Sequence, residues 1–110
     1  MSVFQNTKPV NSIQEFENQL VNQLTEHYGQ YQNVPTPQIK INKGSKFYKI
    51  IVGTSVWGFI ARTPFVHKGV QLKKGDLMMP AGWSAAAKHA RGNVIEGTAM
   101  YGPYGPAYLK

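Results

Sequence analysis

Basic and aromatic side chains alternate in two segments of the chain, and they are the residues best suited to bind a ligand. The candidates are Lys43, Lys46, Phe47, Lys49, Trp57, Arg62, Trp83, Lys88, His89 and Arg91. Aromatic rings flanked by lysine and arginine on a sheet stack bases and follow a phosphate backbone in small nucleic-acid-binding barrels. The pattern therefore predicts binding of single-stranded DNA or RNA with weak sequence preference.

The second of these segments, residues 83–93, has two interpretations. As a short helix it places Lys88 and Arg91 three residues apart on one face, with His89 beside them. Cations near the C-terminal end of a helix interact favourably with its dipole, so a purely structural role is one interpretation. The other is a site in which these three side chains hold a phosphate or carboxylate while Trp83 presents an aromatic surface. The sequence leaves both open.

A domain of this length also needs aromatic side chains for its core. Alternation along residues 46–52 predicts that Phe47 and Lys49 share the solvent face, opposite an all-apolar set. In the next run, Gly58 leaves room for another segment to approach closely. We expect Phe47 and Trp57 to be the exposed aromatic residues of this region.

Clustered catalytic or metal-binding residues are absent from the sequence. There is no cysteine, the three histidines lie in separate segments, and the basic region contains only two acids, Asp76 and Glu96. Two-carboxylate hydrolases and two-metal nucleases need clustered acids, so we predict no enzyme activity, no metal and no cofactor. The remaining catalytic alternative is a metal-independent nuclease built from His89, Arg91 and Glu96. We expect Asp76 to stabilise a turn.

The net charge of +7 is unevenly distributed along the chain. Residues 1–35 hold one lysine and three glutamates, a charge of −2, whereas residues 36–110 hold eleven lysines and arginines against two acids, a charge of +9. Such a basic region fits an anionic partner, most often nucleic acid. No apolar run has the length of a membrane span and no signal-peptide pattern is present, so we expect a cytoplasmic protein without a membrane partner.

The N-terminal segment predicts one amphipathic helix. Ser12 followed by Glu15 is a capping box, and apolar residues recur at helical spacing from Ile13 to Tyr28. The apolar face predicts packing on the protein's own sheet or, as the alternative, a contact between two copies of the chain. Residues 29–37, which contain two prolines, are expected to form a linker.

From residue 36 onward, short β-prone runs separated by turns predict a small antiparallel sheet. Strands are expected at residues 38–42, 46–52, 55–62, 70–72, 77–79 and 94–95. Ser84 then caps a predicted alanine-rich helix over residues 85–90.

The predicted fold class is α+β. The N-terminal helix packs on a small curved antiparallel sheet or partly open barrel, and a short alanine-rich helix lies near the C-terminus. Residues 1–35 are expected to form a helical arm and linker and residues 36–110 a basic β-rich domain, within one compact domain.

The chain contains the block GDLMMPAGWSAAAKHARGNVIEG, preceded by KFYKIIVGTSVWGFIAR and followed by YGPAYLK. These motifs, which extend from Lys46 to Lys110, resemble short uncharacterised proteins encoded by bacteriophages. The resemblance implies a phage source, and hence the host cytoplasm, but no activity. It leaves a second function open, that of an inhibitor or accessory protein that binds a host protein, and a minor virion component as a third.

Overall fold

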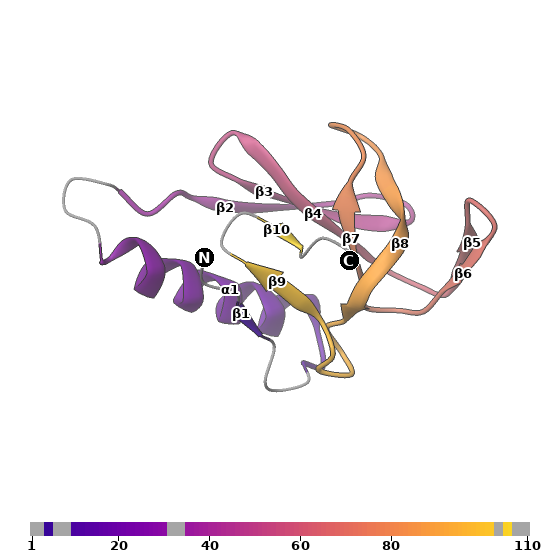
Figure 1. The fold of residues 1–110 in the computed structure, drawn as a ribbon, viewed down its shortest axis with the longest axis horizontal. Helices are drawn as coiled ribbons and strands as arrows, with labels where there is room; N and C mark the ends of the chain where they lie inside the picture. Colours follow the sequence, from indigo (N-terminus) through magenta and orange to yellow (C-terminus); the bar gives the residue numbers. More distant parts are fainter. Residues whose placement is uncertain (1–3, 6–9, 31–34, 103–104, 107–110) are drawn as a thin grey trace.

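One helix and ten strands form the described part of the chain (Figure 1). The computed structural model describes residues 4–5, 10–30, 35–102 and 105–106. The elements are β1 (Phe4–Gln5), α1 (Ile13–Tyr28), β2 (Ile39–Lys43), β3 (Phe47–Val52), β4 (Ser55–Ala61), β5 (Phe65–His67), β6 (Val70–Leu72), β7 (Asp76–Pro80), β8 (Ala86–Asn93), β9 (Met100–Gly102) and β10 (Gly105–Pro106). The fold is therefore mostly β, and the predicted α+β class is wrong.

Five antiparallel strands make the main sheet, in the order β2-β3-β4-β7-β8. Its β3–β4 hairpin confirms the prediction made from residues 46–62. The β5–β6 hairpin, which the sequence analysis did not predict as a pair, projects at one end of the molecule (Figure 1). A separate small sheet has the order β1-β9-β10, so the first strand of the chain pairs with one of the last.

The helix α1 has the predicted bounds, and its cap confirms the predicted start. The Ser12 Oγ accepts a hydrogen bond from the Glu15 N–H at 3.2 Å, and a Glu15 carboxylate oxygen accepts one from the Asn11 N–H at 2.8 Å. The return bond of the capping box thus reaches Asn11 rather than Ser12. Both contacts satisfy backbone donors that a helix start would otherwise leave unpaired.

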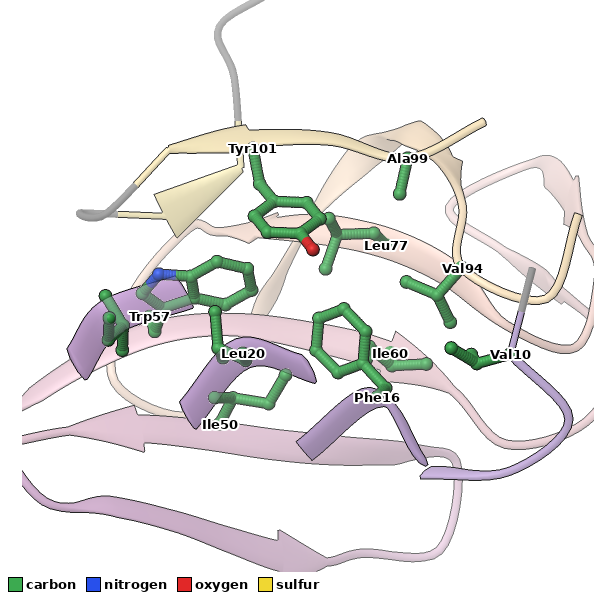
Figure 2. Close-up of a cluster of buried hydrophobic side chains, with 11 residues drawn as sticks. Val10, Phe16, Leu20, Ile50, Trp57, Ile60, Leu77, Val94, Ala99 and Tyr101 are labelled. Carbon is green, nitrogen blue, oxygen red and sulfur yellow. The ribbon is translucent and has the colours of Figure 1, made fainter. Parts of the chain in front are cut away.

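The apolar face of α1 packs on one face of the main sheet, as predicted for packing within the chain (Figure 2). The core there includes Phe16, Leu20, Leu24, Ile50, Trp57, Ile60, Leu77 and Tyr101. The ring centroids of Trp57 and Tyr101 are 5.4 Å apart, and those of Phe16 and Tyr101 are 5.7 Å apart. The Tyr101 hydroxyl donates to Gln23 Oε1 at 2.8 Å, and burial raises the pKa of Tyr101 to about 12.

Trp57 is 2% exposed, so the prediction that it is an exposed aromatic is wrong. Consecutive residues of β3, Ile50 and Ile51, pair with Gly58 and Val56, which leaves Trp57 without a partner. Trp57 is the extra residue of a β-bulge. Because the bulge interrupts the alternation of β4, the indole turns into the core beneath α1.

The prediction of a close approach at Gly58 is confirmed. A Cβ atom on Gly58 would lie 3.1 Å from Pro106 Cγ and 3.1 Å from the Met78 carbonyl oxygen. The space that glycine leaves is therefore filled by β10, which closes the core on the side of the bulge.

The predicted alanine-rich helix over residues 85–90 is wrong, because these residues belong to β8 and the end of the loop before it. β8 pairs with β7, with Met78 opposite Ala90 and Pro80 opposite Ala86. Backbone pairing with β7 and burial of Ala86 outweigh the local preference of alanine for a helix. The strand predicted at residues 94–95 is also wrong, since these residues lie in the turn that follows β8.

The buried amide of Asn93 joins β7, β8 and the turn that follows. Its Nδ2 donates to Asp76 Oδ1 at 2.8 Å and to the Lys74 carbonyl oxygen at 2.9 Å. Its Oδ1 accepts from the N–H groups of Ile95 at 2.8 Å and Glu96 at 3.0 Å. Both donors and both acceptor positions of the amide are therefore used, which stabilises a polar group that is otherwise costly to bury.

The turn before β7 confirms the role expected for Asp76. Its Oδ2 accepts a hydrogen bond from the Lys73 N–H at 2.8 Å. The side chain of Lys73 forms an ion pair with Glu96 at 2.7 Å, and this hydrogen bond and the charge of Glu96 raise the pKa of Lys73. Next to Asn93, Gly92 has a φ of +96°, and a Cβ there would lie 2.2 Å from the Thr98 carbonyl oxygen, so this position requires glycine.

The Asn93 network predicts a large effect of one substitution. Asn93→Ala should lower the free energy of unfolding by about 1–3 kcal/mol, because Asp76 Oδ1 and the N–H groups of Ile95 and Glu96 lose their hydrogen bonds to the amide. Asn42→Ala, at an exposed position of β2, is the matched control and should cost less than about 0.5 kcal/mol. Urea unfolding measures both, and equal losses would contradict a structural role for the network.

The packing of α1 leads to a second prediction. Leu20→Ala should lower the free energy of unfolding by about 2–5 kcal/mol, as for other buried leucines. The neighbouring Val21 is 40% exposed, so Val21→Ala should have a much smaller effect in the same urea titration. A small loss for Leu20→Ala would mean that α1 does not stabilise the sheet.

Candidate nucleic-acid interface

A groove of about 480 Å³ lies on the face of the main sheet opposite α1. Its lining residues are Asn42, Lys43, Gly44, Ser45, Lys46, Phe47, Lys49, Phe59, His67, Ser84, Ala85 and Ala86. They come from β2, β3 and β4, from the β2–β3 turn, from the β5–β6 hairpin, and from the start of β8 and the loop before it. The side is set by strand alternation, because Phe47, Lys49 and Phe59 alternate with core residues that face α1, such as Ile50 and Ile60.

Phe47 forms the floor of the groove. Its ring meets those of Phe59, Phe65 and His67 in edge arrangements, with centroids 5.7, 5.3 and 5.3 Å away. Such tilted contacts are favourable and fix the ring in place. Phe47 is therefore half-buried, and the prediction of an exposed ring is only partly right.

Two lysines lie over aromatic rings at the groove. The Lys49 Nζ is 3.9 Å from the centroid of the Trp83 ring, and the Lys46 Nζ is 5.6 Å from that of Phe65. Trp83, in the loop between β7 and β8, is 58% exposed. The structure thus brings together five of the residues predicted from the sequence, namely Lys43, Lys46, Phe47, Lys49 and Trp83.

His67 belongs to this groove and was missed in the sequence analysis. Its Nε2 lies 3.2 Å from the carbonyl oxygens of both Ala86 and Ala87. Because both partners are acceptors, Nε2 carries the proton and donates. The Lys68 Nζ also donates to the Ala86 carbonyl oxygen, at 3.1 Å. These bonds hold the β5–β6 hairpin against β8. In the sequence, the hairpin could have been recognised from the alternation of Phe65 and His67 before the Lys68-Gly69 turn.

Arg62 lies outside the groove and has a positioning role. Its Nη1 donates to the carbonyl oxygens of Gly44 and, at 3.3 Å, Ser45. Its guanidinium lies 5.6 Å from the centroid of the Tyr48 ring. Arg62 therefore holds the β2–β3 turn, which lines one side of the groove, and does not line the groove itself.

The three remaining candidates lie on β8 and do not line the groove. Arg91 donates to the His89 carbonyl oxygen at 2.6 Å and to Met79 Sδ at 3.4 Å, whereas Lys88 and His89 are exposed. The expected helical spacing, which would have put Lys88 and Arg91 on one face beside Trp83, does not exist in a strand. Without a helix, the proposed stabilisation of Lys88 and Arg91 by a helix dipole is wrong as well, and residues 83–93 do not form a single site.

The groove and α1 differ in the sign of their charged side chains. None of the described residues that line the groove is acidic, and three lysines are among them. Three of the five acids in the sequence, Glu15, Glu17 and Glu26, lie on α1 at the opposite side. The groove is therefore a region of positive potential that attracts anions.

The part of the chain that the structure describes has neither a cluster of metal-binding side chains nor a membrane-spanning helix. It holds no group of three or more histidine, cysteine, aspartate or glutamate side chains placed to bind a metal ion. Its helix is too short and too polar to cross a membrane.

Comparison with protein families gave one match. The model described as "Family of unknown function (DUF7717)" matches residues 3–100. The chain belongs to this family. The matched range runs from β1 into the start of β9 and includes every residue that lines the groove. No curated protein and no solved structure matched the chain.

Substitution of the two tryptophans should affect stability to very different extents. Trp83→Ala should change the free energy of unfolding by less than about 1 kcal/mol, because it removes an exposed ring and one cation–π contact. Trp57→Ala should lower it by about 3–5 kcal/mol, as for a core aromatic. A large loss for Trp83→Ala in urea unfolding would show that this residue supports the fold and is not free to bind a ligand.

Proposed function

We propose that the protein binds single-stranded DNA or RNA, with weak sequence preference, in the groove between the β2–β3 turn and the loop before β8. The observation that carries the proposal is the contact between Lys49 and the exposed ring of Trp83. Further lysines lie beside this pair, and none of the described residues that line the groove is acidic. The proposed setting is the cytoplasm, which is the host cytoplasm if the protein is phage-encoded.

The groove supplies the two contacts that a single strand needs. An exposed indole offers a flat surface on which any base can stack, and lysine ammonium groups attract the phosphates. Phe47 and Phe59 give the groove an apolar floor, and its volume of about 480 Å³ falls within the range of pockets that hold small ligands. Stacking without base-edge hydrogen bonds is the physical reason for weak sequence preference.

The geometry favours a single strand over a duplex. A base reaches the Trp83 ring only if it is free of its neighbours in a stack, as in single strands. An α-helix is one of the elements that fit the major groove of a duplex. The helix α1 lies on the opposite face of the sheet and carries acidic residues, so it is badly placed to enter a groove of DNA.

The role of the groove lysines predicts a defined change in salt dependence. A variant with Lys46→Gln and Lys49→Gln should bind every single strand more weakly, since two phosphate contacts are lost. The slope of log affinity against log salt concentration should become shallower by about 1.4, or 0.7 for each phosphate. Fluorescence anisotropy with labelled single strands over a range of salt concentrations measures both quantities.

A variant with Lys74→Gln and Lys88→Gln is the matched control, because it removes the same charge from exposed positions outside the groove. Its salt slope should stay close to that of the unaltered protein. Equal slopes in both variants would place the binding elsewhere. A stoichiometric complex with a host protein, insensitive to salt, would favour the alternative of an inhibitor or accessory protein.

A further inference from the structure

The contact between Lys49 and Trp83 is closer than the other cation–aromatic contacts of the described residues. The Lys49 Nζ is 3.9 Å from the ring centroid, whereas the other two cations lie 5.6 Å from their rings. Lys49 is half-buried in β3, and Trp83 is largely exposed. The ammonium therefore covers one face of a ring on which a base can stack, and a base that stacks on this face must displace it.

The partner of Lys49 is a weak one. Within the part of the chain that the structure describes, no carboxylate and no carbonyl oxygen bonds to its ammonium, in contrast to Lys73, which pairs with Glu96 at 2.7 Å. A cation over an exposed ring is stabilised far less than a cation at a phosphate in a groove of like charges. Lys49 is thus held in position by a contact that a phosphate can replace.

Resting on the proposed function, we propose that Lys49 moves from the Trp83 ring to a phosphate when a base stacks on that ring. One ring face cannot hold the ammonium and the base together. The groove then recognises a base together with its phosphate, and it distinguishes nucleic acid from polyanions without bases. A polyanion without bases also draws Lys49 from the ring, but no base then stacks there to replace the lost cation–π contact. Such a polyanion therefore binds less tightly.

One substitution should therefore act in opposite directions on two ligands. The probes are a short oligothymidylate and a strand of the same length in which abasic sites replace the thymidines, so that the phosphates are equal in number. Trp83→Ala should weaken binding of the oligothymidylate by about 5- to 150-fold, because stacking is lost. The same change should tighten binding of the abasic strand by about 2- to 5-fold, because Lys49 no longer leaves a ring.

Two further variants show whether Lys49 is responsible. In a Lys49→Gln background, Trp83→Ala should no longer tighten binding of the abasic strand. Lys46→Gln is the matched control, since this lysine lies over Phe65 and not over Trp83. In its background the opposite effects of Trp83→Ala should persist. Circular dichroism confirms that each variant is folded.

The outcomes separate this inference from the proposed function. If the unaltered protein binds neither strand, both are wrong. If it binds both strands and Trp83→Ala weakens binding of both, or changes binding of neither, Lys49 does not exchange partners. The protein then still binds polyanions. If tightening of the abasic strand persists in the Lys49→Gln background, the exchange is likewise overturned. Opposite effects that require Lys49 support it.

Discussion

The buried amide of Asn93 determines how the C-terminal half of the chain is arranged. It joins the ends of β7 and β8 through Asp76 and organises the turn that leads to β9. The register of the β7–β8 pair shifts twice between this end and the opposite end, where Pro80 pairs with Ala86. The loop between them carries Trp83 to the ring contact with Lys49 of β3. The hairpin that presents Trp83 is thus held at its opposite end by the Asn93–Asp76 hydrogen bond.

The main sheet separates two environments. One face packs against α1 and holds the larger core, and the other has a smaller apolar cluster whose outer part is the groove. Strand alternation allows the same few strands to serve both faces. The bulge at Trp57 is the exception, and it moves the largest side chain of β4 to the side where α1 and Tyr101 surround it. The larger core against α1 thus shares no buried residue with the groove lining, whereas Phe59 and Ala86 of the smaller cluster belong to both.

The sequence predicted best the features that depend on local patterns. The helix from Ile13 to Tyr28 follows from its cap and periodicity, and the β3–β4 hairpin follows from its β-prone runs. The space at Gly58 and the turn at Asp76 were likewise predictable from residue type. Among the candidate ligand-binding residues, those of the β2–β3 turn and β3 lie together because they are adjacent in one hairpin.

The errors arose where distant contacts outweigh local preference. Residues 85–90 favour a helix by composition, but pairing with β7 makes them a strand or the end of a loop. That error also placed Lys88 and Arg91 on one helical face, which the strand does not have. The bulge at Trp57 has no signal in the alternation of β4, because it depends on how β3 pairs with it. His67 is brought to the groove by bonds to Ala86 and Ala87, about twenty positions later in the chain.

The closure of the helix-side core by β9 and β10 constrains the order in which the protein folds as it is synthesised. Tyr101 packs on the Trp57 indole, and Pro106 fills the space over Gly58. β1, at the other end of the chain, pairs with β9. Before residues 101–106 are made, α1 and the β3–β4 hairpin can already pack together, but the Trp57 indole lacks the part of its cover that Tyr101 provides. Completion of this core is therefore an event that follows translation of residue 106, and contacts so distant in sequence form slowly.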